Sequence, residues 1–238
     1  MSMAGDRLHL LCAGAAQGLV KSLQARFMHE AGAQLQGRFG AVGVLKEALL
    51  AGEACDVMVA TAAMIDALSA QGELQGTTRA PLGSVGTGIA VREGRALPRI
   101  GDAAALREAL LAADALYFPD PLRATAGIHF ADVLRRLGIH ETLAPRFRTF
   151  PNGATSMREL AAAPSAHPIG CTQVTEISDT EGVHLVGPLP PGFGLTTVYC
   201  AAVADRAAQP ALAQRFIALL CGTGSEALRR AGGFDPDG

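Results

Sequence analysis

The sequence has few charges and almost no excess of either sign. Charged residues make up 18% of the 238 residues, the formal net charge is −2, and lysine occurs only at Lys21 and Lys46. Surfaces that bind nucleic acid or membranes usually concentrate positive charge, so this composition argues against both kinds of partner. No apolar run approaches the roughly 18 residues that span a bilayer. With 49% hydrophobic residues, we expect a water-soluble globular protein with enough core for one large domain or two lobes.

The first residues lack the features of a secretory signal. Arg7 leads directly into the apolar run Leu8–Cys12, which is too short for the apolar region of a signal and is typical of a first strand. We therefore expect a cytoplasmic protein as the sequence is written, or a periplasmic one if the native start has been replaced.

The cysteines lack the spacing of a metal site or a disulfide framework. The five are Cys12, Cys55, Cys171, Cys200 and Cys221, with no CxxC pair and no Cys/His cluster. Three of them lie inside apolar runs, where a thiol usually behaves as a small core residue. We therefore expect no disulfide, no metal and no cofactor, and reduced thiols favour the cytoplasm.

The chain does contain an alternation of short apolar runs with amphipathic stretches. Leu19, Leu23 and Phe27, for example, recur at helical spacing before Gly32. Strand–turn–helix units repeated in this way are typical of an α/β fold with an open parallel sheet and crossover helices. Strands are expected at 8–13, 35–39, 57–60, 115–118, 147–150 and 168–172, with longer extended segments at 83–92 and 196–203. Helices are expected before Gly32 and Gly52, at 62–68, 102–112 and 125–137, from 155 onward, and twice near the end, the first from Pro210.

Several segments, taken in order, resemble the molybdate-binding substrate-binding proteins of ABC transporters, within the type II periplasmic-binding superfamily. They are Phe39-Gly-Ala-Val-Gly-Val-Leu45, Gly52-Glu-Ala-Cys-Asp56-Val, Asp120-Pro121 with Gly127-Ile-His129-Phe, and Gly187-Pro-Leu-Pro-Pro191. The resemblance covers almost the whole chain. It implies a two-lobed α/β type II periplasmic-binding-protein fold with a ligand cleft between the lobes. Residues 1–82 and 198–238 would form lobe 1 and residues 83–197 lobe 2. An ABC permease would be a partner if the protein is exported.

The ligand site departs from the pattern of molybdate binders. That family holds its oxyanion with two serines at helix starts and a tyrosine late in the second lobe. Spacing from Phe27 and Phe39 places Ala15 at the first serine and Ala41 or Val42 at the second. Gln173 stands where the tyrosine would be. Each hydrogen bond to a charged oxygen contributes about 1.5–3 kcal/mol, so molybdate is not the expected ligand.

Four strand-to-helix turns keep the chemistry of an anion site. They are Gly14–Gln17, Gly40–Gly43, Ala124–Gly127 and Asn152–Thr155, and we expect their free backbone N–H groups to attract an anion together with the helix dipoles. Such a cradle suits a small organic anion, namely a di- or tricarboxylate such as citrate or aconitate. The candidate ligand-binding residues are Ala15, Ala16, Gln17, Ala41, Val42, Arg123, Thr125, Ala126, Asn152, Ala154, Thr155, Gln173 and Thr175.

Each of these residues also has a structural interpretation. Gly40-x-x-Gly43 is a plain tight turn if the resemblance is set aside, and Arg123 suits a solvated loop equally well. Asp56 is expected to orient backbone where a strand begins. His129 fits a partly buried helix position better than a catalytic one. Glu176 fits a hydrogen-bond partner, a general base or an acid at a helix start, and the sequence does not choose among them.

Three functions remain open from the sequence. The first is a binding protein for a small organic acid, feeding a transporter or a sensor. The second is an isomerase like aconitate isomerase, which resembles the same family. There, a 1,3-proton shift between cis- and trans-aconitate would use His129 or Glu176 as the acid/base and no cofactor. The third, a cytoplasmic ligand-sensing or partner-binding module, is the least supported.

Overall fold

The structure is a computed structural model that describes residues 6–237, and the chain divides into two compact units. Unit 1 extends to Ser84 and resumes at Thr197, and unit 2 is Val85–Thr196. The boundaries expected from the sequence, 82/83 and 197/198, lie two residues before the first of these and one residue after the second.

Unit 1 is built on strands in the order β2-β1-β3-β9. The strands β1 (Arg7–Ala13), β2 (Gln34–Gly40) and β3 (Val57–Thr61) are parallel to one another, whereas β9 (Thr196–Val203) pairs antiparallel with β3. The open parallel sheet expected from the strand–helix repeats is therefore confirmed for β1, β2 and β3 and does not extend to β9. An apolar run indicates burial but carries no information on strand direction.

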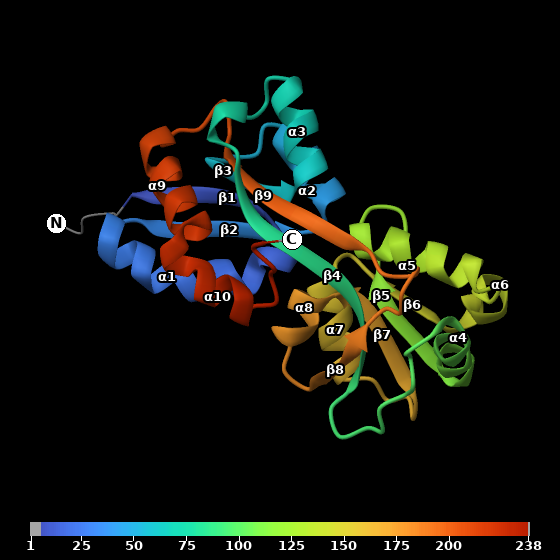
Figure 1. The fold of residues 1–238 in the computed structure, drawn as a ribbon. Helices are drawn as coiled ribbons and strands as arrows, with labels where there is room; N and C mark the ends of the chain where they lie inside the picture. The colour runs from blue at the N-terminus through green and yellow to red at the C-terminus, as the bar shows by residue number, and fades with distance from the viewer. Residues whose placement is uncertain (1–5, 238) are drawn as a thin grey trace. The chain divides into compact units, whose positions relative to one another are not determined.

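Helices bury both apolar faces of this sheet. Figure 1 shows α1 (Gln17–Ala31), α9 (Pro210–Cys221) and α10 (Glu226–Ala231) gathered together, and Phe27 of α1 packs edge-on against Phe216 of α9 with ring centroids 5.1 Å apart. The helices α2 (Val42–Leu50) and α3 (Ala62–Ala70) contact β1 and β3. Short 3₁₀ turns occur at η1 (Gly14–Ala16), η2 (Gly76–Thr78) and η4 (Thr223–Ser225).

Asp56 connects three segments of unit 1 through its backbone partners. Its Oδ2 accepts the His9 backbone N–H at 2.8 Å, and its Oδ1 accepts the Gln209 backbone N–H at 2.9 Å. The carboxylate thus fixes β1 and the start of α9 beside β3. This confirms the interpretation of Asp56 as a residue that orients backbone.

Unit 2 has its own mixed sheet. The strands β4 (Ala80–Arg92), β7 (Pro168–Gln173), β5 (Ala115–Pro119) and β6 (Phe147–Phe150) follow in that order, and β8 (Val183–Pro188) pairs with β4. Three strands, β5, β6 and β7, are parallel, and both β7 and β8 are antiparallel to β4. The strand β8 and the short helix α6 (His140–Leu143) were not expected from the sequence, and α8 (Val174–Ser178) was anticipated only through the alternative that Glu176 stands at a helix start.

The middle of this sheet is buried on both faces. Along β5, Leu116 and Phe118 belong to one apolar cluster with α4 (Ala103–Ala112) and α5 (Thr125–Arg136). The alternate residues Ala115 and Tyr117 belong to a second cluster with α7 (Gly153–Ala161) and α8. Because successive side chains of a strand point to opposite faces, β5 is covered on each side by helices. A 3₁₀ turn, η3, occupies Ala144–Arg146.

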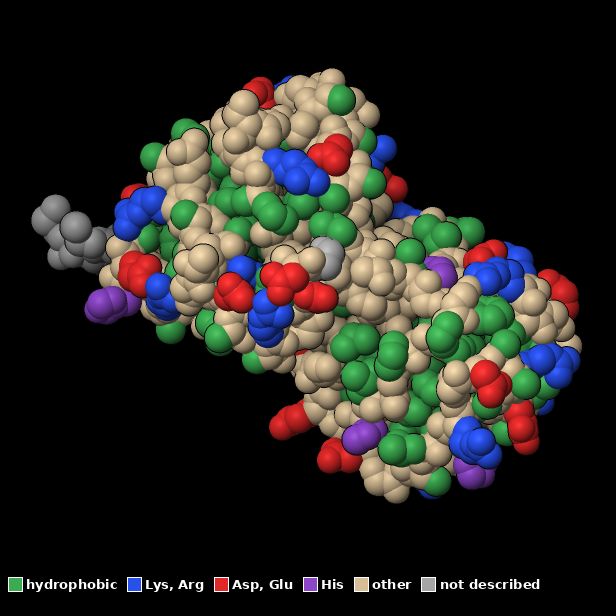
Figure 2. Space-filling view, viewed as in Figure 1, with side chains coloured by type: hydrophobic (Ala, Val, Ile, Leu, Met, Phe, Trp, Pro, Cys, Tyr) green, Lys and Arg blue, Asp and Glu red, His purple; other side chains and the backbone are tan. Residues whose placement is uncertain are grey.

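The surface mixes both signs of charge. Figure 2 shows Lys and Arg side chains interspersed with Asp and Glu on the face in view, in keeping with the net charge of −2. Within residues 6–237, no helix is long and apolar enough to cross a membrane.

Candidate functional site

In each unit the parallel strands end at one edge of the sheet, and helices begin there. In unit 1, η1 and α1 follow β1, α2 follows β2 and α3 follows β3; in unit 2, α5, α7 and α8 follow β5, β6 and β7. Ligands of open α/β sheets bind outside the carboxyl ends of the strands, where these helix N-termini converge. The predicted ligand residues lie at these helix starts.

The helix starts differ in whether a side chain caps them. The residue before α3 is Thr61, whose Oγ1 accepts the Met64 N–H at 3.3 Å, and Asp102 before α4 accepts the Ala105 N–H at 2.8 Å. In contrast, α2 and α5 begin after Ala41 and Ala124, and neither receives a side-chain cap from a described residue. Alanine at this position costs about 0.5–2 kcal/mol relative to a capping residue. The first amides of α2 and α5 are therefore left for another partner.

In unit 1 the predicted residues occupy the starts of the first two helices. The alanines Ala15 and Ala16 are buried in η1, and Gln17, the first residue of α1, is half-buried. At the second turn, Ala41 and Val42 are buried. These residues present backbone and apolar groups, with Gln17 the one polar side chain in the set.

In unit 2 the start of α5 packs closely on the end of β5. A Cβ at Gly127 would collide with the carbonyl oxygens of Pro119 and Asp120, so glycine lets the helix begin against the strand. The carboxylate of Asp120 accepts the Leu122 N–H at 2.7 Å and shapes the approach. At this start Arg123 is exposed, Thr125 half-buried and Ala126 buried.

The start of α7 is already filled by the protein. The Asn152 Oδ1 accepts the Thr155 N–H at 2.8 Å, and the Glu176 carboxylate lies against Gly153, where a Cβ would collide with its Oε2. The Thr155 hydroxyl accepts a bond from Arg158 at 3.0 Å. The expectation that the turn Asn152–Thr155 presents free amides is therefore wrong for Thr155, because the Asn152 side chain accepts its N–H.

Glu176 is buried among hydrogen-bond donors. Its Oε2 accepts the Thr172 hydroxyl at 2.5 Å, and the backbone N–H groups of Gly153, Ala154 and Gln173 lie near the carboxylate. Burial raises the pKa of the Glu176 carboxyl above its usual value, and these donors pull the pKa in the opposite direction. Glu176 is therefore a buried carboxyl that lies beside the start of α7, and its raised pKa means that it takes up a proton more readily than an exposed glutamate.

The spacing of Gln173 and Glu176 predicts part of this contact, although it was not interpreted in that way from the sequence. Gln173 is the N-cap of α8, which makes Glu176 its third residue. A glutamate at that position commonly reaches back to the N-cap backbone N–H, as in a capping box. The same carboxylate also reaches α7, and no pattern in the sequence indicates that second contact.

The side chains of Gln173 and Thr175 lack partners. Gln173 is 2% exposed and Thr175 is 4% exposed. The Gln173 Nε2 and Oε1 and the Thr175 Oγ1 have no hydrogen-bond partner among residues 6–237. A buried polar group without a partner costs about 1–3 kcal/mol. These atoms are the clearest indication in unit 2 of a site made for a polar ligand.

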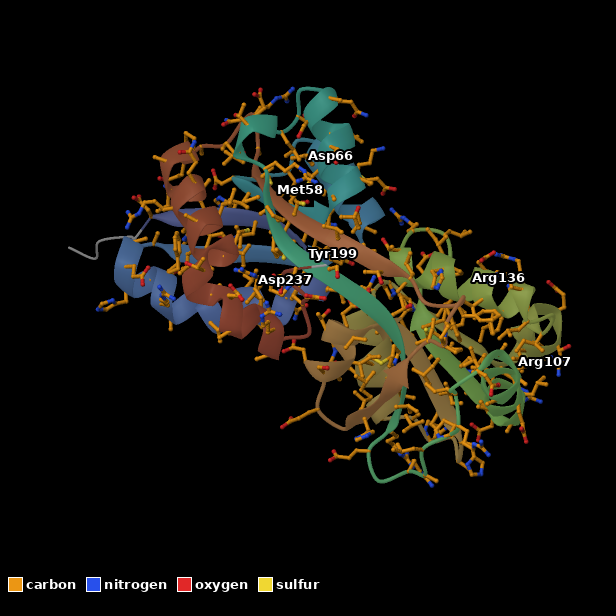
Figure 3. The ribbon with its side chains drawn as sticks, in the orientation of Figure 1. Met58, Asp66, Arg107, Arg136, Tyr199 and Asp237 are labelled. Atoms are coloured by element: carbon orange, nitrogen blue, oxygen red, sulfur yellow. The ribbon has the colours of Figure 1, made fainter. Side chains whose placement is uncertain are left out.

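His129 contacts a loop of its own unit. Its Nε2 lies 2.7 Å from the Phe193 carbonyl oxygen. About two turns further along α5, Arg136, which is labelled in Figure 3, donates to the Gly192 carbonyl at 2.6 Å, and its guanidinium lies 4.5 Å from the centre of the Phe193 ring. This nitrogen of His129 is thus occupied by backbone, which favours the structural interpretation over a role as base.

The described residues offer no alternative chemistry based on metal or sulfur. Among them, no group of three His, Cys, Asp or Glu side chains is placed to hold a metal ion. The five cysteines are free thiols. Burial raises the pKa of the Cys55 thiol to about 12, which keeps it protonated and unreactive near neutral pH.

Comparison with known proteins agrees with this architecture. The periplasmic molybdate-binding protein of Azotobacter vinelandii superposes with a TM-score of 0.79 at 18% identity, over 96% of this chain and 98% of that one. The sulfate-binding protein of Mycobacterium tuberculosis H37Rv gives 0.75 at 16% identity, over 98% and 87%. The fold is therefore a mixed α/β, periplasmic-binding-protein-like fold.

A sequence relative carries an enzyme name. The aconitate isomerase of a Pseudomonas species is 24% identical over 169 residues, which are 71% of this chain, and the chain spans 62% of the length of that relative. The family model described as bacterial extracellular solute-binding protein matches residues 8–235. The chain, structurally like molybdate-binding proteins, belongs to this family of bacterial extracellular solute-binding proteins.

Proposed function

We propose that this solute-binding protein takes a small organic anion, a di- or tricarboxylate of the size of citrate or aconitate. The observation that carries the proposal is the pairing of uncapped helix starts with unpartnered side chains. In unit 2, α5 begins after Ala124 without a side-chain cap, and Gln173 and Thr175 keep buried polar atoms without partners. Free amides at a helix N-terminus favour a carboxylate, and neutral side chains beside them select its shape.

The proposed ligand contacts in unit 1 are the start of α2 after Ala41, where the N-cap residue provides no side-chain cap, and the Gln17 side chain of α1. The α5 contacts of Arg123 and Thr125 complete the proposed set, and no cofactor is needed.

The residues at the predicted ligand positions disfavour the binding of a tetrahedral metal oxyanion such as molybdate. Ala15 and either Ala41 or Val42 stand where the resemblance places the two serines of molybdate binders, and none of the three carries a hydroxyl. Two missing donors to a charged oxygen, at about 1.5–3 kcal/mol each, would weaken molybdate binding by a hundredfold or more. The relatives named for molybdate and sulfate therefore support the fold of this site and not its ligand.

Thermal unfolding with a panel of anions tests the proposal. Citrate, tricarballylate, malate and succinate form the carboxylate arm, and molybdate and sulfate the oxyanion arm. A carboxylate at a hundred times its Kd should stabilise the protein by about 2.7 kcal/mol. A strong shift with molybdate and none with any carboxylate would overturn the argument from Ala15 and Val42.

A second candidate function is isomerisation of aconitate, which the named Pseudomonas relative favours. The same amide donors would hold the carboxylates and stabilise the enolate-like charge of a 1,3-proton shift. Incubation of the protein with cis-aconitate, followed by proton NMR for the trans isomer, tests it directly. Absence of turnover at micromolar protein, in a sample that binds carboxylates, would leave the binding function alone.

For a transport role, the partner would be an ABC permease and the compartment the periplasm. Fractionation of cells that express the native gene distinguishes this role from a cytoplasmic one. Recovery of the protein with the cytoplasmic fraction would reject delivery to a permease while leaving ligand binding intact.

A further inference from the structure

The Gln173 side chain can make two kinds of hydrogen bond, one as a donor and one as an acceptor. Its Nε2 is a donor and its Oε1 an acceptor, and both lack partners among the described residues although the residue is 2% exposed. Because both atoms are unpartnered, the conclusion does not depend on which way round the amide is placed. A ligand that satisfies this side chain must offer an acceptor and a donor.

An ionised carboxylate, sulfate or molybdate oxygen can only accept. Bound beside Gln173, such a group would pair with Nε2 and leave Oε1 buried without a partner. An unpaired buried acceptor costs about 1–3 kcal/mol. A hydroxyl on the ligand removes this cost, because it donates to Oε1 while still accepting from another group.

The backbone near Gln173 provides no hydrogen-bond partner for its side chain. Its backbone N–H lies near the Glu176 carboxylate, and the two polar atoms of its side chain are those that lack partners among the described residues. The neighbouring carboxylate also disfavours a further anionic oxygen at this point and favours a neutral donor group. The Thr175 hydroxyl, unpartnered as well, can turn to serve either kind of group.

We propose that the ligand is a hydroxy acid, a di- or tricarboxylate with a hydroxyl that donates to Gln173. The inference rests on the proposed function and narrows it. Citrate and malate belong to the preferred class. Tricarballylate, succinate and fully ionised aconitate, which carry acceptors alone, do not.

Pairs of ligands that differ by one hydroxyl group measure what that hydroxyl contributes to binding. Calorimetric titrations at about pH 8, where the carboxyl groups are ionised, compare citrate with tricarballylate and malate with succinate. The hydroxy acid of each pair should bind roughly tenfold tighter. In Gln173→Met, which keeps the length of the side chain and removes both polar atoms, the ratio within each pair should fall to about one.

The control variant is Gln71→Met, at an exposed position of unit 1, which should keep the wild-type ratio. Thermal melting without ligand checks that Gln173→Met folds, and Gln173→Glu gives a second test. Glutamate at position 173 keeps an acceptor, so Gln173→Glu should still prefer the hydroxy acid. Both members of each pair should bind to this variant more weakly than to the wild type.

The outcomes separate the two proposals. Equal affinity for both members of each pair in the wild type overturns the hydroxy-acid inference and leaves carboxylate binding in place. Binding of neither member overturns the carboxylate proposal and this inference with it. A wild-type preference that survives unchanged in Gln173→Met assigns the hydroxyl to another residue and also overturns the inference.

Discussion

The Glu176 carboxylate lies so close to the backbone of Gly153 that position 153 has room only for a hydrogen atom. A Cβ there would collide with Glu176 Oε2 and with Thr172 Oγ1. The start of α7 therefore holds a carboxylate supplied by α8, and the two helices are joined by a buried polar contact.

We predict that Gly153→Ala destabilises the protein. The added methyl group must displace Glu176 from the amides of α7, which should lower the free energy of unfolding by about 1–3 kcal/mol. Urea denaturation followed by circular dichroism measures the change. The control is Gly101→Ala, where a Cβ meets open space, and equal stability of the two variants would contradict the packing described for Glu176.

The buried carboxyl of Glu176 should make stability depend on pH in a defined direction. Its folded pKa is raised above the ordinary 4.5 by burial. Just above that value the folded state binds more protons than the unfolded state, so this group's contribution falls as pH rises. The stability of the wild type relative to Glu176→Gln should decrease with rising pH through this range. Denaturation over a pH series checks the slope, with exposed Glu181→Gln as control; a relative stability that rises with pH would reject the prediction.

A side-chain cap added at the start of α5 should raise the stability of the protein and lower its affinity for the ligand. In Ala124→Asp the new carboxylate accepts the first amides of the helix and should stabilise the protein by about 0.5–2 kcal/mol. The same amides are then lost to the ligand, so citrate affinity should fall at least tenfold. Asp102→Ala is the converse control, because it removes the cap of α4 and should lower stability without altering Kd. Unchanged citrate affinity in Ala124→Asp would exclude α5 from the site.

Replacement of His129 should preserve most of the stability when the new side chain keeps the hydrogen bond to the Phe193 carbonyl. Glutamine can place an N–H near the Phe193 carbonyl, so His129→Gln should retain most of the stability, whereas His129→Leu leaves that carbonyl unpaired and should cost about 1–3 kcal/mol. Neither change should abolish citrate binding. If aconitate turnover is observed, its survival in His129→Gln separates a positioning role from an acid/base role, and complete loss with a stable fold would favour the base.

Much of the fold could be predicted from the sequence because it is encoded locally. The pattern of Leu19, Leu23 and Phe27 indicated α1, and Gly32 ends that helix with a φ of 68°. The buried strands were evident as apolar runs between turn residues. Strand direction was not, because an apolar run looks the same whether β9 enters a sheet parallel or antiparallel.

The assignment of residues to helix starts could be predicted from the sequence, whereas the ligand site that they would form stays a prediction. Helix starts after parallel strands follow from the order of the elements, so Ala41, Thr125 and Gln173 could each be assigned in advance to the carboxyl end of a strand. The contact of Glu176 with Gly153 could not, because it depends on how α7 and α8 pack. The same holds for His129, whose partner Phe193 lies on a distant loop.

The division of the chain also bears on how the protein is made. Unit 2 is one continuous segment, Val85–Thr196, whereas unit 1 needs β9 and α9 from beyond Thr197 to complete its sheet and helical layer. Because a ribosome delivers residues in order and domains generally fold as units, unit 2 can reach its native state while synthesis continues. Unit 1 must wait with an open sheet edge on β3, and truncation near residue 196 should yield a folded second unit attached to an aggregation-prone first one.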